Sequence, residues 1–170
     1  MTLPDKYRVL IITLSDRAAN REYDDLSGPR IRELLAGFLS SEGWDYDIDS
    51  VVIPDSEEKL SNLIMDGRNR YNFIFTTGGT GIGPRDITVE TVSMLLDREI
   101  PGIMDFIRIK YGAENPGALL SRGIAGLAGR TLIYTLPGSL RAVDEYMAEI
   151  LKTLRHTVLM QYGVDTHGKH

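Results

Sequence analysis

One stretch near the middle of the chain decides the fold: Asn72-Phe73-Ile74-Phe75-Thr76-Thr77-Gly78-Gly79-Thr80-Gly81-Ile82-Gly83-Pro84-Arg85-Asp86. Segment 72–77 is rich in aromatic and β-branched residues, which predicts a buried strand. Four glycines follow within six residues, and Thr88 is expected to cap the helix that comes next. A strand that leads through a glycine-rich loop into a helix indicates an α/β protein with a ligand site at the carboxyl end of that strand.

Strand and helix patterns alternate on both sides of this junction. We expect further strands at 7–14, 46–53, 123–128 and 131–136. We expect helices at 27–41, 55–69, 88–96, 101–113 and 139–159, and a polar loop at 15–25. This alternation predicts a single α/β domain of three layers, with helices on both faces of a mainly parallel sheet. The domain is expected to span residues 1–170, with an ordered core at about 5–160 and a polar tail at 161–170.

The composition narrows the classes of function. The net charge of −5 opposes nucleic-acid binding, and the lack of cysteine excludes thiolate chemistry. No apolar run approaches the roughly 18 residues that a membrane helix needs. The N-terminus lacks a signal-peptide pattern, so we expect a cytoplasmic protein with no membrane partner. His156, His167 and His170 lie in the last helix and the tail, where none can serve a nucleophilic serine or a metal site.

The glycine-rich segment 78–83, called the glycine loop below, has the composition of an anion site. Glycine lets backbone N–H groups approach a ligand closely, and the helix that follows adds the positive end of its dipole. The spacing is neither that of a P-loop nor that of a dinucleotide-binding loop. The loop contains no lysine, so Arg85 is its one local cation and Mg²⁺ would have to neutralise a polyphosphate. We favour an anion site over a flexible connection, because so many glycines lower stability.

Two aspartates are candidates for chemistry, and each also has a structural interpretation. Asp86 either supports the helix start electrostatically or binds Mg²⁺ beside phosphates, and spacing leaves both open. Asp55 follows the second strand and forms a predicted capping box with Glu58, which favours a capping role. Glu90 falls in the first turn of a predicted helix, where a carboxylate suits the helix dipole. Ser15 and its neighbours follow the first strand without a histidine to activate the hydroxyl.

Taken together, the ordered motifs resemble those of the molybdenum-cofactor biosynthesis domain, the family that includes MogA, MoaB and the G domain of gephyrin. Segments at five places carry this resemblance in addition to 77–81 and 85–88: Ser15-Asp16-Arg17, Ile53-Pro54-Asp55, Arg98-Glu99-Ile100-Pro101-Gly102, Leu120-Ser121-Arg122 and Leu136-Pro137-Gly138-Ser139. They recur in order over nearly the whole chain. Segment 24–28 and the Ser139-Leu140 pair are more similar to MoaB-like members.

The resemblance implies the fold of MogA and the activity of a molybdopterin adenylyltransferase, with molybdopterin and Mg²⁺-bound ATP as substrates. Asp55 and Asp86 match the family's catalytic aspartates and are the expected Mg²⁺ ligands. Substrate and nucleotide contacts are implied for Ser15, Asp16, Gly78, Gly79, Thr80, Gly81, Arg85, Glu90, Ser121, Pro137, Gly138 and Ser139. The resemblance also implies a homo-oligomer, a trimer or a hexamer.

Two other functions fit the same motifs. One is a MoaB-like protein that binds pterin or nucleotide without turnover, and the other is a nucleotide hydrolase of the competence-damage type. Retention of both Asp55 and Asp86 favours the transferase. Release of pyrophosphate in the presence of molybdopterin distinguishes the transferase from the binding protein.

Overall fold

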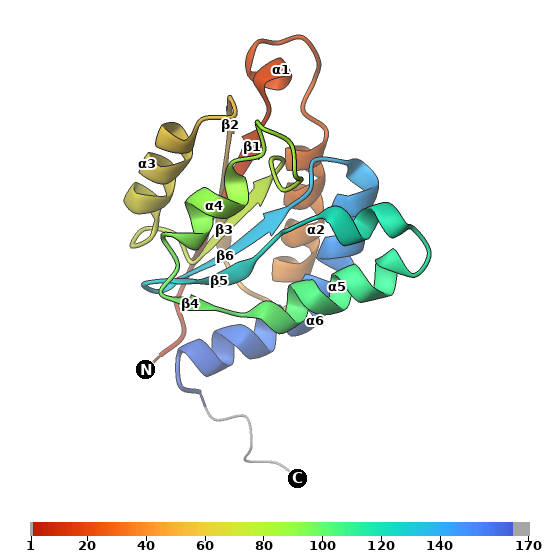
Figure 1. Cartoon of the computed structure of the whole chain (residues 1–170). Helices are drawn as coiled ribbons and strands as arrows, with labels where there is room; N and C mark the ends of the chain where they lie inside the picture. Colours follow the sequence, from red (N-terminus) through yellow and green to blue (C-terminus); the bar gives the residue numbers. More distant parts are fainter. Residues whose placement is uncertain (1, 165–170) are drawn as a thin grey trace.

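A six-stranded sheet forms the centre of the molecule, and the computed structural model describes residues 2–164 (Figure 1). Its strands are β1 (Tyr7–Leu14), β2 (Tyr46–Ile53), β3 (Phe73–Thr77), β4 (Arg98–Glu99), β5 (Ala125–Ala128) and β6 (Thr131–Leu136). They lie in the order β2-β1-β3-β6-β5-β4. The four strands β2, β1, β3 and β6 pair in parallel, whereas β5 and β4 add an antiparallel edge. The mainly parallel sheet is therefore confirmed.

Helices cover both faces of this sheet, as predicted (Figure 1). On one face lie α2 (Ser27–Ser41), α5 (Pro101–Gly112) and α6 (Leu140–Gln161), whose apolar side chains join one buried cluster with the sheet. On the other face lie α3 (Glu57–Gly67) and α4 (Thr88–Ser93), which pack into a second cluster. Strand β1 shows why its apolar run is unbroken: Val9 and Ile11 enter the first cluster, and Leu10 and Ile12 enter the second.

Two predicted helix caps are wrong. Helix α3 is capped by Ser56, whose hydroxyl accepts from the N–H of Lys59 at 3.3 Å, so the capping box of Asp55 and Glu58 does not form. Asp55 lies one residue too early and turns toward the loop after β1. Thr88 is the first residue of α4 rather than its cap, and its buried hydroxyl donates to the carbonyl of Gly78 at 2.8 Å. That bond ties α4 to the glycine loop.

Short elements account for the other differences. Residues Asp16–Ala19 form the one-turn helix α1 within the segment predicted to be a loop, and Ser15 caps it. The 3₁₀ helix η1 (Pro116–Leu120) and the two-residue strand β4 carry too little pattern to be seen in a sequence. His156 is exposed on α6 as predicted, whereas His167 and His170 lie outside the described residues. None of the helices within residues 2–164 has the length and apolar composition that a membrane span requires.

Candidate active site

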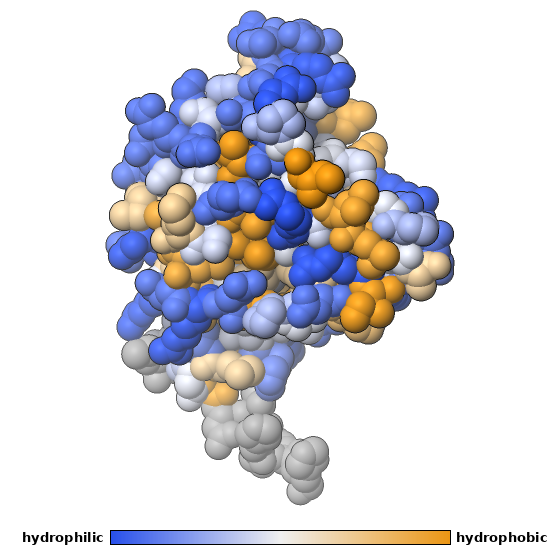
Figure 2. Space-filling model, in the orientation of Figure 1, coloured by the Kyte–Doolittle hydropathy of each residue, from blue (hydrophilic) through white to orange (hydrophobic). Residues whose placement is uncertain are grey.

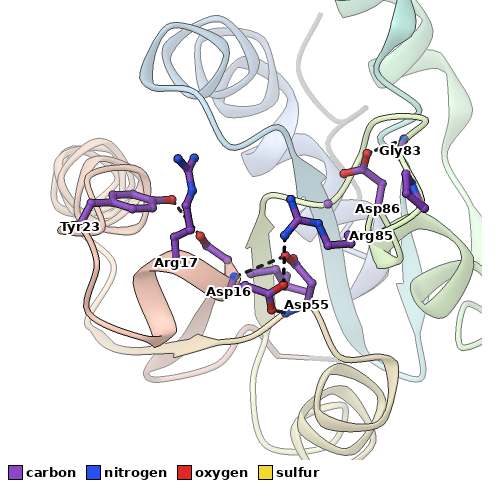
Figure 3. Close-up of a pocket in the computed structure, with 11 residues that line it drawn as sticks. Asp16, Arg17, Tyr23, Asp55, Gly83, Arg85 and Asp86 are labelled. Atoms are coloured by element: carbon purple, nitrogen blue, oxygen red, sulfur yellow. Dashed lines mark hydrogen bonds and ion pairs between the residues drawn. The ribbon is translucent and has the colours of Figure 1, made fainter.

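A polar cavity of about 280 Å³ opens at the carboxyl ends of β1, β2 and β3 (Figure 3). Parallel pairing of these neighbouring strands brings together loops that are far apart in the sequence. The cavity is lined by Leu14, Ser15, Asp16, Arg17, Tyr23, Asp55, Gly79, Gly83, Pro84, Arg85 and Asp86. The structure thus brings both predicted catalytic aspartates to one cavity, together with Ser15, Asp16, Gly79 and Arg85.

Asp16 and Asp55 join the ends of two neighbouring strands. The N–H of Asp55 donates to Oδ1 of Asp16 at 2.9 Å, and the N–H of Asp16 lies 3.4 Å from Oδ2 of Asp55. Partial burial raises the pKa of Asp55 above its ordinary value of 3.8, and the negative charges of Asp16 and Asp86 raise it further. The hydrogen bond from the N–H of Asp16 and, less strongly, the charge of Arg85 oppose this effect. The guanidinium of Arg85 lies 3.6 Å from the carboxylate of Asp16 (Figure 3). The anionic form of Asp55 would therefore be stabilised by a further cation beside it.

The glycine loop lies so close to β1 and α4 that two of its residues have no room for a side chain. Gly78 and Gly79 have φ values of +99° and +68°, a region that favours glycine. A Cβ at Gly79 would lie 2.4 Å from Oγ1 of Thr88, and one at Gly78 would lie 2.3 Å from the carbonyl oxygen of Leu14. Glycine is therefore required at both positions, which a merely flexible connection would not demand.

Asp86 stabilises the glycine loop itself, which adds a third role to the two that its spacing left open. Its Oδ2 accepts from the N–H of Gly83 at 2.7 Å. A Cβ at Gly81 or Gly83 would lie 2.8 or 2.9 Å from the same oxygen, so both glycines make room for this carboxylate. Helix α4 begins two residues later with no side-chain cap. Asp86 therefore shapes the loop and also presents a carboxylate to the cavity.

The glycine loop also contains hydrogen-bond donors that have no acceptor within residues 2–164. Within residues 2–164, the N–H groups of segment 79–82 donate to no protein acceptor. Backbone N–H groups of this kind, next to the start of a helix, form the usual cradle for a phosphate. The geometry supports the anion site that the glycine pattern predicted.

A second cavity of about 230 Å³ adjoins the first and shares Leu14, Ser15 and Tyr23 with it. It is also lined by Thr13, Asp25, Leu26, Ser27, Thr77, Gly138 and Leu140. The hydroxyl of Ser27 donates to the carbonyl of Gly138 at 2.6 Å, which joins the start of α2 to the turn after β6. Sequence reasoning assigned no role in the site to Tyr23, Asp25 or Ser27, although segment 24–28 contributed to the resemblance.

Several residues predicted to contact ligand lie beside the two cavities rather than in their walls. Pro137 accepts through its carbonyl from the hydroxyl of Thr77, and Ser139 caps α6. Gly78 packs on β1, and Gly81 packs on Asp86.

Three others support the loop from its flank. The buried hydroxyl of Thr80 lies 3.3 Å from that of Ser121, and Glu90 forms an ion pair with Arg122. The structure therefore shows Thr80, Ser121 and Glu90 in contacts within the protein.

The carboxylates suit a cation that arrives with its ligand better than a metal held by protein alone. Among the described residues, no three acidic or histidine side chains converge as a metal-binding group. Asp55 and Asp86 nevertheless face one open cavity with oxygen donors, the ligand type that Mg²⁺ prefers. Mg²⁺ commonly takes one or two carboxylates together with phosphate oxygens and water, and the residues present fit that arrangement.

Fold and site define a class: an α/β protein with a glycine loop and carboxylates around a polar cavity at the carboxyl ends of its parallel strands. The sequence matches the family model described as "Probable molybdopterin binding domain" over residues 10–156. The chain therefore belongs to this family of molybdenum-cofactor domains, as its motifs predicted.

Similar proteins include both named types of bacterial relative. Molybdenum cofactor biosynthesis protein B of Bacillus cereus is 34% identical over 152 residues, covering 87% of this chain and 86% of that protein. The molybdopterin adenylyltransferase of Helicobacter pylori J99 is 30% identical over 156 residues, covering 90% and 86%. Gephyrin of Dictyostelium discoideum is 35% identical over 161 residues and 91% of this chain, which spans 22% of gephyrin's length.

Solved structures agree with the fold. The molybdopterin biosynthesis enzyme MoaB of Thermus thermophilus superimposes with a TM-score of 0.82 at 36% identity, covering 92% of this chain and 97% of that one. A MogA structure gives a TM-score of 0.80, also at 36% identity, with coverages of 91% and 99%. The predicted MogA-like fold is confirmed.

Proposed function

We propose that this protein acts in molybdenum cofactor biosynthesis as a molybdopterin adenylyltransferase, which converts ATP and molybdopterin into adenylylated molybdopterin and pyrophosphate. The observation that carries the proposal is one cavity that is lined by Asp16, Asp55 and Asp86 and by Gly79, which begins the segment 79–82 whose N–H groups have no acceptor within residues 2–164. The relative of that name in Helicobacter pylori, at 30% identity over 90% of this chain, supports it.

The reaction needs positioning more than acid–base catalysis. The terminal phosphate oxygen of molybdopterin forms a bond to the α-phosphorus of ATP. The bond from that phosphorus to the bridging oxygen breaks, and pyrophosphate leaves with the electron pair. Because the attacking phosphate is already anionic near neutral pH, no histidine base or serine nucleophile is required, and Ser15 lines the cavity without a histidine beside it in the lining. The free N–H groups of segment 79–82 would hold phosphate oxygens and stabilise the charge that moves onto them.

Asp55 and Asp86 are the residues that would hold the Mg²⁺ of the nucleotide. Bound Mg²⁺ neutralises phosphate charge and makes the pyrophosphate a better leaving group. Burial and, less strongly, the charges of Asp16 and Asp86 raise the pKa of Asp55, and a cation beside it would offset these effects. The N–H of Gly83 holds one oxygen of Asp86, which orients the carboxylate in the cavity wall.

Two adjoining cavities offer separate places for the two substrates. The cavity beside the glycine loop suits the phosphates of ATP, and the cavity of about 230 Å³ next to it would take part of the pterin ligand. The shared wall at Leu14, Ser15 and Tyr23 keeps the two ligands adjacent, as transfer from one to the other requires.

The proposal is tested with the purified full chain, Mg²⁺, ATP and molybdopterin. Release of pyrophosphate that depends on molybdopterin is the expected result, and adenylylated molybdopterin is identified by mass spectrometry. Tight molybdopterin binding without any pyrophosphate would overturn the transferase and leave the MoaB-like binding protein, a name that also occurs among the relatives. Pyrophosphate or phosphate released from nucleotide without molybdopterin would indicate a hydrolase.

We also propose that the chain forms a homo-oligomer. The support is an apolar area over α5 and η1, where Phe106, Ile109, Leu119 and Leu120 are all more than half exposed (Figure 2). Apolar groups gathered in this way on a folded surface mark an interaction site.

A further inference from the structure

Arg122 holds the glycine loop through hydrogen bonds to the backbone of the loop. Its backbone N–H donates to the carbonyl of Thr80 at 2.9 Å. Its guanidinium donates twice to the carbonyl of Gly81, from Nε at 2.9 Å and from Nη2 at 2.7 Å. Arg122 is not among the residues that line the cavity of about 280 Å³. Two successive carbonyls of the loop are therefore fixed by one residue from outside the site.

Glu90, on α4, fixes the guanidinium in turn. Its carboxylate accepts from Nη1 of Arg122 and, at 3.3 Å, from Nη2. The hydrogen bond from Arg122 lowers the pKa of Glu90 and raises that of Arg122. A planar guanidinium held along two edges has one orientation, which a lysine ammonium could not reproduce. Glu90, Arg122 and Gly81 form a continuous chain of contacts.

This chain of contacts sets the direction of the loop's amides. In a trans peptide the C=O and N–H groups point to opposite sides, and no cis peptide occurs in the described residues. Drawing the carbonyls of Thr80 and Gly81 toward Arg122 therefore turns the N–H groups of Gly81 and Ile82 away from it. These two N–H groups are among the donors that find no acceptor within residues 2–164. The contacts with Arg122 therefore orient two backbone donors that have no acceptor in the described part of the chain.

We propose that Arg122 and Glu90 are positioning residues that preorganise the glycine loop for phosphate, with Glu90 acting only through Arg122. The proposal rests on the proposed function in one respect: the anion is the phosphate chain of ATP. It replaces the direct ligand contact that the resemblance implied for Glu90. Arg122 was not assigned to the site from the sequence, because nothing in the order of residues shows that segment 120–122 meets segment 79–81.

The first test follows the loop amides themselves by NMR on the full-length chain labelled with ¹⁵N. In the native protein, MgATP should shift the amide signals of Gly81 and Ile82. In Arg122→Ala, we expect these signals to broaden or move before ligand is added, and the Kd for MgATP to rise about tenfold. Arg122→Lys keeps the charge beside Glu90 and should still bind like the alanine variant. Native amide signals and native affinity in both variants would overturn the proposal.

A matched control is Arg155→Gln, which breaks a remote ion pair between Arg155 and Glu42 at 2.8 Å. It should leave the loop amides and the affinity for MgATP unchanged. Thermal unfolding followed by circular dichroism shows whether each variant is folded. If Arg122→Ala is unfolded, Arg122→Lys and Glu90→Ala carry the test.

A double-mutant cycle then examines Glu90. If Glu90 acts only through Arg122, Glu90→Ala weakens MgATP binding in the native background, and in the Arg122→Ala background it has no further effect. Equal effects in both backgrounds would show that Glu90 contacts ligand or metal directly, and would overturn its positioning role. Failure of the transferase proposal is distinguishable, because it shows as missing pyrophosphate, whereas the amide signals and MgATP affinity require no molybdopterin.

Discussion

Under the proposed function, Asp55 would serve catalysis at a cost in stability. Its pKa is raised by burial and by the charges of Asp16 and Asp86. The charged form of Asp55 therefore destabilises the fold above the raised pKa, and this destabilisation disappears as pH falls through that pKa toward the ordinary value of 3.8. Asp55→Asn should therefore be as stable as the native protein or more stable, by up to about 1 kcal/mol at pH 7.

The same substitution should abolish pyrophosphate release, because the amide supplies no charge for Mg²⁺. Urea unfolding at pH 7 and at pH 3, together with the release assay, tests both expectations. The stability difference should shrink at the lower pH. A variant that is clearly less stable at pH 7, with activity retained per folded molecule, would show that Asp55 is a structural residue.

Gly79 and Gly37 form a matched pair for testing the glycine loop. At Gly79, φ is +68° and a Cβ would meet Thr88, so Gly79→Ala should cost about 1–3 kcal/mol of unfolding free energy. Gly37 lies within α2 with nothing within 4 Å of a Cβ, so Gly37→Ala should instead stabilise by about 0.5–1 kcal/mol. Chemical denaturation measures both. Equal effects at the two sites would mean that the loop conformation is not enforced.

At the residue scale, the sequence identified the candidate site better than the role of each side chain. Glycine density and the carboxylates at strand ends are local signals, and the structure brings Gly79, Asp55 and Asp86 to one cavity. The roles of Glu90 and Ser121 depend on partners about 30 to 40 positions away, a relation that residue order does not contain. Asp55 was expected to cap a helix because Glu58, three residues later, suggested a capping box, but the actual cap is its neighbour Ser56, an equally good capping residue.

At the scale of elements, the capping of α3 by Ser56 rather than Asp55 allows stability and activity to be tested separately. Ser56 accepts a hydrogen bond from Lys59 at the start of α3, so Ser56→Ala should cost about 0.5–2 kcal/mol of stability. Its effect on pyrophosphate release per folded molecule should be small, because Ser56 does not line the cavity. Thermal melts and initial rates measured on one preparation test this. Loss of activity without loss of stability would contradict it.

The contact between α5 and α6 depends on Glu149, a carboxylate only 6% exposed. Hydrogen bonds from Lys110, Lys152 and Tyr111 surround it, and the bond from Lys110 is the main reason that its pKa falls to about 2. A lowered pKa stabilises the fold above the ordinary value of 4.5, and this contribution is lost as pH falls toward 2.

Glu149→Gln should therefore make the stability of the fold less dependent on pH. Between pH 4.5 and 2, the native protein should lose about 1–2 kcal/mol more stability than the variant, allowing for the solvent exposure of Lys110. Urea unfolding at several pH values measures the two curves, and Glu114→Gln, at an exposed position after α5, serves as the control. Parallel curves for Glu149→Gln and the native protein would refute the assignment.

The long strands and helices could be predicted from the sequence because their apolar residues recur at the spacing with which they pack into the core. The strands at 7–14, 46–53 and 131–136 have the predicted bounds: segments 7–14 and 131–136 are mainly apolar runs, and segment 46–53 alternates before it turns apolar. The helix at 88–96 is shorter than predicted and ends at Ser93. Its apolar residues Leu95 and Leu96 continue the helical spacing but pack against the second core cluster from the turn that follows.

At the scale of the whole molecule, alternation of strands and helices indicated the layers but not the order of the strands. The order β2-β1-β3-β6 places Asp55 next to Asp16 and the glycine loop next to the turn after β6. The order and register of the strands depend on contacts between residues that are far apart in the sequence, so the pattern of each strand does not show which strand it pairs with. The order of the strands therefore assembles the candidate site, although each of its parts is a local motif.

The exposed apolar area over α5 and η1 leads to a prediction about assembly. Its largest exposures are 71% at Ile109 and 59% at Leu120, and polar residues surround it (Figure 2). A second copy of the chain that covered this area would bury apolar surface worth about 25 cal/mol per Å².

We expect light scattering after size exclusion to give the mass of a trimer or a hexamer. Ile109→Asp should lower that mass, because it buries an unpaired charge in the contact. Met65→Asp, a similarly apolar exposed position on α3 across the sheet, should leave the mass unchanged. A monomeric native protein would refute the prediction, and an equal loss of mass in both variants would place the contact elsewhere.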